Sequence, residues 1–245
     1  MINILILLGF SKVSARWIPH SLTEEEKKKR FYYSKNMLRR FKREKDKFLG
    51  NLITGDESWI PFFIHETKEK SKEWIKKGER VLLKVRPNRF SKKLMLSVFW
   101  DKEGLLFLEL TSKTITADTY IQTLENLQKE IKVLRPNMKK IILLHDNAKS
   151  HTERKVKEKI MEFKWGLLDH PPYSPDLSPS DYYLFRPLKN ELRGIRYPNK
   201  EELEFSIRAW FHKQQPDFFQ KGIYKLLERW KFCKEVEGDY LEKKK

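Results

Sequence analysis

Three aspartates stand at positions from which they could act together on a phosphodiester. Asp56 lies in a segment with the pattern of a strand, Asp146 comes just after the apolar run 141–144, and Asp181 stands where a helix begins after a proline-rich loop. Converging carboxylates repel one another unless a cation neutralises them. Oxygen ligands favour Mg²⁺ or Mn²⁺ over zinc, and two such ions can activate a nucleophile and stabilise a leaving oxygen. These residues predict a metal-dependent nuclease or phosphoryl transferase.

Each aspartate also has a plain structural alternative. Asp56 could be a turn residue beside Gly55, and Asp181 could be a first-turn charge favoured by the helix dipole. His145 and His151 flank Asp146 and could be zinc ligands, but no cysteine is near them. We expect these histidines instead to orient the strand end, its ligand or DNA. Taken singly, the aspartates fit the structural alternatives better than the catalytic one.

The elements that must position the aspartates follow from the apolar pattern. In chain order they are a helix from Ser21 capped by Thr23 and Glu26, a strand carrying Asp56, a hairpin of 94–100 and 105–110, a helix over 121–134, a strand at 141–144, a helix around 156–163, a strand near 165–168 and helices from Ser180 onward. This order predicts an α/β fold with a mixed five-stranded sheet flanked by helices. We expect one domain over 23–245, a residual linker over 1–22 and an exposed basic insertion at 65–93.

The composition indicates a nucleic-acid partner. The 245 residues include 52 Lys+Arg and 34 Asp+Glu, which give a formal net charge of +18. Such an excess favours a polyanion through phosphate contacts and counterion release. Basic residues run through the whole chain, so DNA is a better expectation than an anionic membrane. The single cysteine, Cys233, excludes an internal disulfide and fits a reducing compartment.

An apolar run at 2–10 is the one segment that suggests targeting. It is too short to span a bilayer and lacks the positive charge that precedes a secretory apolar stretch. We interpret it as part of an inter-domain linker or a misassigned start, with a targeting signal as the alternative. No membrane association is expected.

Three sequence blocks resemble the signatures of mariner-family DNA transposases. They are TGDESWI (54–60), HDNAKSH (145–151) and HPPYSPDLSPSDYYLF (170–185), and 34 residues separate Asp146 from Asp181, as in that family. WIPHSLT (17–23) is similar to the family's linker motif. The resemblance implies an RNase H-like catalytic domain with Asp56, Asp146 and Asp181 as the metal-binding triad. It also implies two Mg²⁺ or Mn²⁺ ions, DNA cleavage at transposon ends, strand transfer into TA sites and a nuclear location.

The resemblance extends to partners. It implies a homodimer on double-stranded DNA and no small-molecule substrate. Trp17, Pro19 and His20 are expected to dock the linker against the second subunit. Apart from the resemblance, the basic residues Arg86, Arg89, Lys92 and Lys93 form either a DNA contact or a solvated loop, and His151 is a further candidate DNA contact.

Two departures from the family pattern are visible. Family members begin with two helix-turn-helix modules, for which there is no room ahead of Trp17, so we expect the recognition modules to be missing. Pro61 removes a backbone donor from an expected central strand, which a strand end or bulge could accommodate. Two functions remain as alternatives to a transposase: a domesticated or decayed DNA-binding protein, and a nuclease that cuts without joining.

Overall fold

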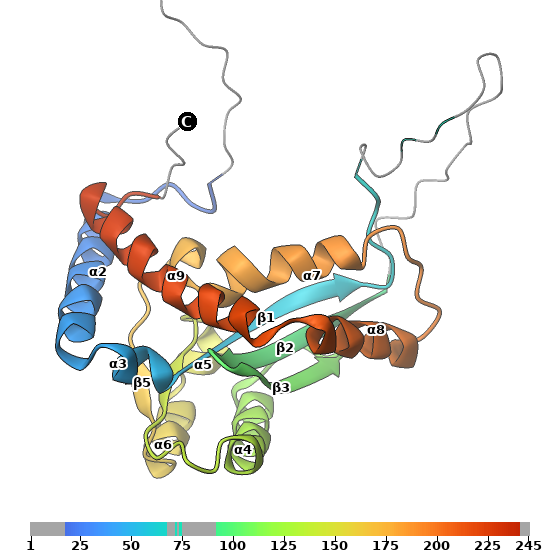
Figure 1. Cartoon of the computed structure of the whole chain (residues 1–245), viewed down its shortest axis with the longest axis horizontal. Coiled ribbons are helices and arrows are strands. Elements are labelled where there is room, and N and C mark those ends of the chain that lie inside the picture. The colour runs from blue at the N-terminus through green and yellow to red at the C-terminus, as the bar shows by residue number, and fades with distance from the viewer. Residues whose placement is uncertain (1–17, 68–71, 73, 75–91, 241–245) are drawn as a thin grey trace, which may run out of the picture.

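Five strands form one mixed sheet in the order β3-β2-β1-β4-β5 (Figure 1). The computed structural model describes residues 18–67, 72, 74 and 92–240. The strands are β1 (Leu52–Pro61), β2 (Lys93–Asp101), β3 (Gly104–Thr111), β4 (Ile142–Leu144) and β5 (Gly166–Leu168). β2 is antiparallel to β1 and β3, whereas β4 is parallel to β1 and β5. The predicted five-stranded mixed sheet and its chain order are confirmed.

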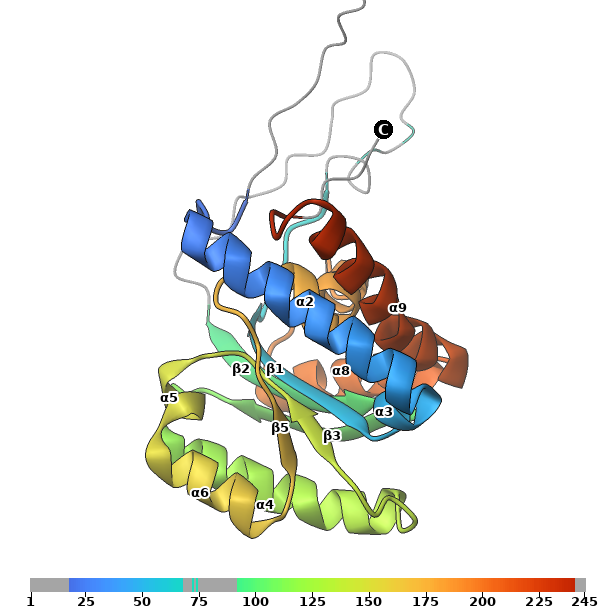
Figure 2. The same cartoon turned by 90° about the vertical axis from the view of Figure 1, so that its left-hand side faces the viewer.

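Helices cover both faces of the sheet. They are α2 (Glu24–Glu44), α3 (Asp46–Gly50), α4 (Ala117–Leu134), α5 (Lys149–Thr152), α6 (Arg154–Glu162), α7 (Phe185–Glu191), α8 (Lys200–Lys213) and α9 (Pro216–Glu235). Figure 2 shows α2 and α9 side by side on one face of the sheet, with α4 and α6 on the other. The predicted capping box at the start of α2 is confirmed, because Thr23 Oγ1 accepts from Glu26 N and the Glu26 carboxylate accepts from Thr23 N.

Alternation along β1 divides the core into two parts. Leu52 and Ile60 belong to the cluster that also holds Trp230 of α9, whereas Ile53 belongs to the cluster with Leu124 of α4. Successive side chains of a strand point to opposite faces. Asp56 therefore shares the α9 face with Leu52 and Ile60, and Glu57 shares the α4 face with Ile53.

Gly55 is a strand residue that admits a neighbouring ring. It pairs with Phe99 of β2, and a Cβ at Gly55 would lie 2.1 Å from Phe99 Cε1. The Phe99 ring, which is fully buried, therefore occupies the space of the missing side chain. The interpretation of Asp56 as a turn residue beside a glycine is wrong, because both residues lie inside β1.

Pro61 is the last residue of β1 and costs the sheet no hydrogen bond. The next amide, Phe62 N, donates to Lys92 O on the β2 side, so the Pro61 nitrogen faces the opposite edge. On that edge β4 pairs only with Leu52–Thr54. The expected strand end therefore accommodates the proline.

Several predicted features fall outside the described residues. These are the run 2–10, Trp17, Arg86, Arg89 and most of the insertion at 65–93. Within the described part, His20 stacks on Tyr173 of its own chain with ring centroids 4.0 Å apart, and Pro19 is exposed. Docking of this linker on a second subunit stays a prediction. Of the helices within 18–67 and 92–240, none combines the length and apolar character that crossing a bilayer requires.

Candidate active site

Strand register brings Asp56 and Asp146 together. Thr54 of β1 lies opposite Leu144 of β4 in a parallel pair, and each aspartate is two residues farther along its chain. The two therefore stand at the same level where β4 ends, the edge at which open α/β sheets place their sites. Asp181 lies in the first turn of a π-helical segment, η2 (Ser180–Leu184), that leads into α7. The predicted helix start is confirmed, and its π geometry was not predicted.

Asp56 and Asp181 interact electrostatically, and both have raised pKa values. Asp56 is 7% exposed, and its Oδ2 accepts from Ser178 Oγ at 2.9 Å. Burial raises the pKa of Asp56 well above its usual value, and the charges of Asp181 and Glu57 add to the rise. Asp181 reaches the surface, but its carboxyl group is partly shielded from water; this shielding raises its pKa to about 6, although the hydrogen bond with Asp56 opposes the rise. The pair therefore favours holding a proton.

Asp146 is held in the ionised form. His151 Nδ1 lies 2.8 Å from Asp146 Oδ1, and Ala148 N donates to the same oxygen at 2.9 Å. Burial alone would raise the pKa of Asp146, but these two partners outweigh it, and the pKa is lowered. Two carboxylates that favour a proton and one that does not thus meet at one edge of the sheet.

His151 is a buried cation between two acidic groups. Its side chain is 1% exposed, and its Nε2 lies 3.4 Å from Glu57 Oε2. Burial would lower the pKa of His151, but the pairing with Asp146 and Glu57 raises it to about 10. A side chain so enclosed has no surface to offer DNA, which corrects the predicted DNA contact. Its place fits the other expected role, orientation of the strand end and its ligand.

His145 is the neutral counterpart of His151. The two rings stack 5.0 Å apart, and Tyr120 Oη forms a 2.7 Å hydrogen bond with His145 Nδ1. Burial lowers the pKa of His145 to about 3, and the neighbouring charge of His151 acts in the same direction. Tyr120 also stacks on His151 at 3.9 Å. The three rings form a rigid wall behind Asp146.

Two polar residues of the site carried no recognised signal in the sequence. Ser178 lies inside the third block and supports Asp56, and its hydroxyl could have been suspected from its position near Asp181. Lys189 of α7 donates to Ser58 Oγ at 2.7 Å; burial lowers its pKa, and the charges of Asp181 and Asp56 oppose that shift. Lys92 and Lys93 are exposed, and Lys93 Nζ lies 4.4 Å from the centre of the Trp59 ring. They remain candidate DNA contacts.

The donor set fits a divalent cation of the magnesium type. Within residues 18–67 and 92–240, no three His, Cys, Asp or Glu side chains are already arranged around one metal position. Asp56 instead accepts a hydrogen bond from Ser178, and Asp146 accepts one from Ala148 N and lies beside His151. Burial raises the pKa values of Asp56 and Asp181, and the charges of neighbouring carboxylates add to the rise, so a bound cation would favour the ionised form of both. Carboxylate oxygens are the ligands that Mg²⁺ and Mn²⁺ prefer.

Millimolar Mg²⁺ or Mn²⁺ should raise the thermal midpoint of unfolding, since a ligand of the folded state stabilises it by mass action. At a concentration of 100 times Kd the gain is about 2.7 kcal/mol. The metal competes with the proton that Asp56 and Asp181 favour, so the shift should be small at pH 5 and grow as pH rises through about 6. Calorimetry at pH 5, 6 and 8, with ionic strength matched by NaCl, measures it. An unchanged midpoint at pH 8 would contradict the assignment.

The chain is similar in sequence to known transposases. The family model described as Transposase (partial DDE domain) matches residues 64–141. Mariner Mos1 transposase of Drosophila mauritiana is 39% identical over 241 residues, which cover 96% of this chain and 68% of that protein. Histone-lysine N-methyltransferase SETMAR of Homo sapiens is 32% identical over 240 residues, which cover 96% of this chain and 34% of that protein.

The structural similarity is equally extensive. A crystal structure of the mariner Mos1 paired end complex with Mg superposes with a TM-score of 0.90 at 38% identity, covering 98% of this chain and 71% of that chain. The RNase H-like fold implied by the sequence blocks is thereby confirmed. With this identity held over nearly the whole chain and more than two thirds of Mos1 transposase, the protein belongs to the mariner family of DNA transposases.

Proposed function

We propose that this chain cleaves DNA strands at transposon ends and transfers the freed 3′ hydroxyl into target DNA at TA dinucleotides. Asp56, Asp146 and Asp181 would hold two Mg²⁺ or Mn²⁺ ions. The observation that supports the proposal most is the placement of these three carboxylates in one electrostatically linked site. Further support comes from Mos1 structures with Mg, with Mn and in a strand transfer complex, to which this chain is similar.

The chain's own groups prepare the site for that chemistry. Bound divalent ions would activate the attacking oxygen and stabilise the leaving one. Ser178 Oγ fixes the orientation of the Asp56 carboxylate, and His151 keeps Asp146 ionised and turned toward the sheet edge. Asp56 and Asp181, whose pKa values are raised by burial, would have to be ionised to hold the ions. Because these groups are held by buried partners, little reorganisation is needed during the reaction.

Duplex DNA is the proposed partner. The net charge of +18 favours phosphate contacts, which position a protein on DNA without reading its sequence. Mos1 has been seen in a paired-end complex with the left transposon end. By analogy we propose that this chain acts as a homodimer on DNA in the nucleus, with Trp17, Pro19 and His20 at the subunit contact. Lys92 and Lys93, together with Arg86 and Arg89, are the proposed phosphate contacts.

Strand transfer can be tested with a pre-cleaved duplex that ends in a free 3′ hydroxyl. Incubated with the chain, Mg²⁺ and a supercoiled plasmid, it should yield joined products, and sequencing the junctions should show insertion at TA. The reaction should stop when EDTA replaces Mg²⁺. A plasmid that is nicked but never joined would support the nuclease alternative instead.

A retained DNA-binding protein without transposition is the second candidate function. It is favoured by the match to SETMAR, in which a similar segment forms 34% of a protein named for a different activity. Duplex binding with neither nicking nor joining, in Mg²⁺ and in Mn²⁺, would favour it.

A further inference from the structure

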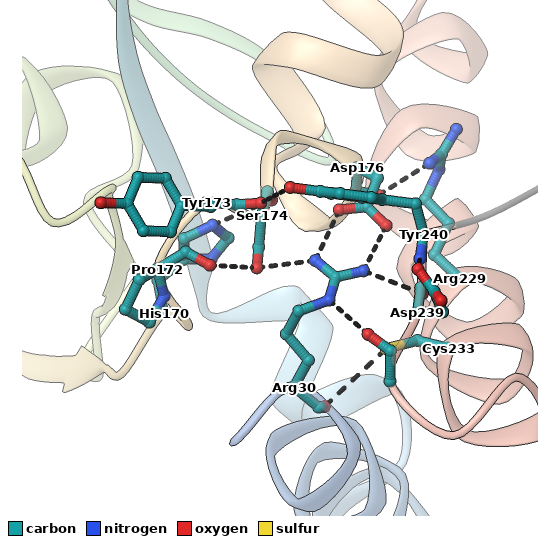
Figure 3. Close-up of polar contacts among 11 residues, drawn as sticks. Arg30, His170, Pro172, Tyr173, Ser174, Asp176, Arg229, Cys233, Asp239 and Tyr240 are labelled. Carbon is teal, nitrogen blue, oxygen red and sulfur yellow. Dashed lines mark hydrogen bonds and ion pairs between the residues drawn. The ribbon is translucent and has the colours of Figure 1, made fainter. Parts of the chain in front are cut away.

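Arg30 of α2 is fully buried, and all five of its N–H donors are used (Figure 3). Nε donates to Gly238 O at 2.7 Å. One terminal nitrogen donates to Ser174 Oγ at 2.7 Å and to Asp176 Oδ1 at 2.8 Å. The other donates to Asp176 Oδ2 at 2.7 Å and to Asp239 O at 3.2 Å. One guanidinium thus joins α2, the loop 170–178 and the segment that follows α9.

The contacts around Arg30 make the junction rigid. Tyr240, whose ring centre lies 4.8 Å from the guanidinium carbon, donates from its hydroxyl to Tyr173 O at 2.9 Å. Arg229 of α9 donates to Asp176 O at 2.7 Å. Gly238 has a φ of 89°, and a Cβ there would lie 1.9 Å from Lys27 O, so the chain after α9 approaches α2 as closely as only glycine permits.

The loop held by Arg30 leads directly into the active site. Asp176 belongs to the short 3₁₀ turn η1 (Pro175–Leu177). Ser178, the first residue after this turn, supports the Asp56 carboxylate. Asp181 follows three residues later. Leu177 through Ser180 are all buried, and Trp100 Nε1 donates to Ser180 Oγ at 3.0 Å. Because the residues between them are buried, a displacement of Asp176 should also displace Asp181.

We propose that Arg30 is a positioning residue, which sets Ser178 and Asp181 against Asp56 by fixing the loop 170–178. This inference rests on the proposed function for its effect on catalysis. The planar fork of arginine is essential, because it serves two carboxylate oxygens, a hydroxyl and two carbonyls from different directions. Lysine keeps the charge but presents its donors from one atom and cannot reach these five acceptors together.

Arg135 provides a matched control. Its Nε and one terminal nitrogen donate to the two oxygens of Asp101 at 2.8 and 3.0 Å, and the Asp101 side chain is 1% exposed. This pair joins the end of α4 to the β2–β3 hairpin, and Arg135 bonds to Asp101, Glu103 and Leu134 O, none of which belongs to the loop 170–178. Arg135→Lys therefore removes a half-buried fork that pairs with a buried carboxylate, at a place where positioning of Asp181 is not affected.

The test compares the full chain carrying Arg30→Lys or Arg135→Lys with the wild type. Both variants should lower the thermal midpoint. Only Arg30→Lys should speed hydrogen exchange at the Leu177, Ser178 and Tyr182 amides, which donate to Ser174 O, Pro175 O and Ser178 O. Only Arg30→Lys should slow strand transfer, by about 100-fold, the effect of a misplacement on the order of 1 Å, with KM for DNA unchanged.

Asp176→Asn is a milder variant, in case Arg30→Lys does not fold, and should show the same pattern to a smaller degree. Wild-type exchange at the three amides in a folded Arg30→Lys or Asp176→Asn would overturn the proposal. So would equal losses of strand transfer in Arg30→Lys and Arg135→Lys, because these would reflect stability alone. If the wild type joins no DNA, the proposed function fails, while the exchange measurement still decides whether Arg30 fixes the loop.

Discussion

Asp181→Asn should reduce Mg²⁺-dependent nicking and strand transfer by orders of magnitude while duplex binding persists. Asparagine keeps the size of the side chain but removes the charge with which Asp181 would hold a metal ion. Binding to DNA rests on phosphate contacts made by basic residues elsewhere, so it should survive. Rates with the pre-cleaved duplex and a mobility-shift titration with the same duplex measure the two effects.

The same variant should not be less stable than the wild type without metal. The fold raises the pKa of Asp181 to about 6, so its stabilising effect is present below the ordinary pKa near 3.8 and is lost as pH rises through about 6. The midpoint of Asp181→Asn should therefore equal or exceed that of the wild type at pH 8. Asp217→Asn is the matched control, since Asp217 also lies in the first turn of a helix and is exposed. Wild-type cleavage by Asp181→Asn would exclude Asp181 from the triad.

His151→Gln should produce the largest loss of stability among substitutions in the site. Removing one partner of a buried ion pair leaves the others uncompensated, which costs roughly 3 kcal/mol. Here the uncompensated groups would be Glu57, whose side chain is 12% exposed, and the half-exposed Asp146. Urea unfolding at pH 7 without divalent metal measures the change in the free energy of unfolding.

The pH dependence gives the stricter test of the charge on His151. Because the fold raises its pKa from 6.5 to about 10, the stability it supplies is complete below pH 6.5 and is lost as pH approaches 10. The difference in the free energy of unfolding between wild type and His151→Gln should therefore become smaller from pH 7 to pH 10. His145→Gln replaces the neutral stacked ring. Its free energy of unfolding should differ from that of the wild type by an amount that does not vary over this range. A constant difference for His151→Gln as well would mean that His151 is uncharged.

The sequence predicts most of the framework and the aspartates of the site. Apolar runs of β-type residues predict β1 and the hairpin, and apolar residues at helical spacing predict α4. These elements follow local patterns, which a single sequence reveals. Asp146 could be placed at a strand end because a fully apolar run precedes it. Its alignment with Asp56 depends on the β1–β4 register, which only the folded chain shows.

Residues that act through distant partners could not be found in this way. Arg30 stands beside Lys28 and Lys29 in a very basic helix, and no local feature marks it as the one that is fully buried. Its partner Asp176 is 146 residues away. The sequence leaves His151 as a residue that orients the strand end, its ligand or DNA, and no local feature indicates that its side chain is buried. Its burial depends on Glu57, whose side chain points to the α4 face because it follows Asp56 along β1.

The junction at Arg30 also bears on which changes to the coding sequence the folded protein can tolerate. A stop codon in place of Val236 leaves the codons for Asp56, Asp146 and Asp181 in frame, yet it deletes Gly238 and Asp239, whose carbonyls Arg30 binds. Nonsense and frameshift changes between the codons for Val236 and Asp239, which spare all three aspartates, should therefore disturb the loop 170–178 as Arg30→Lys does.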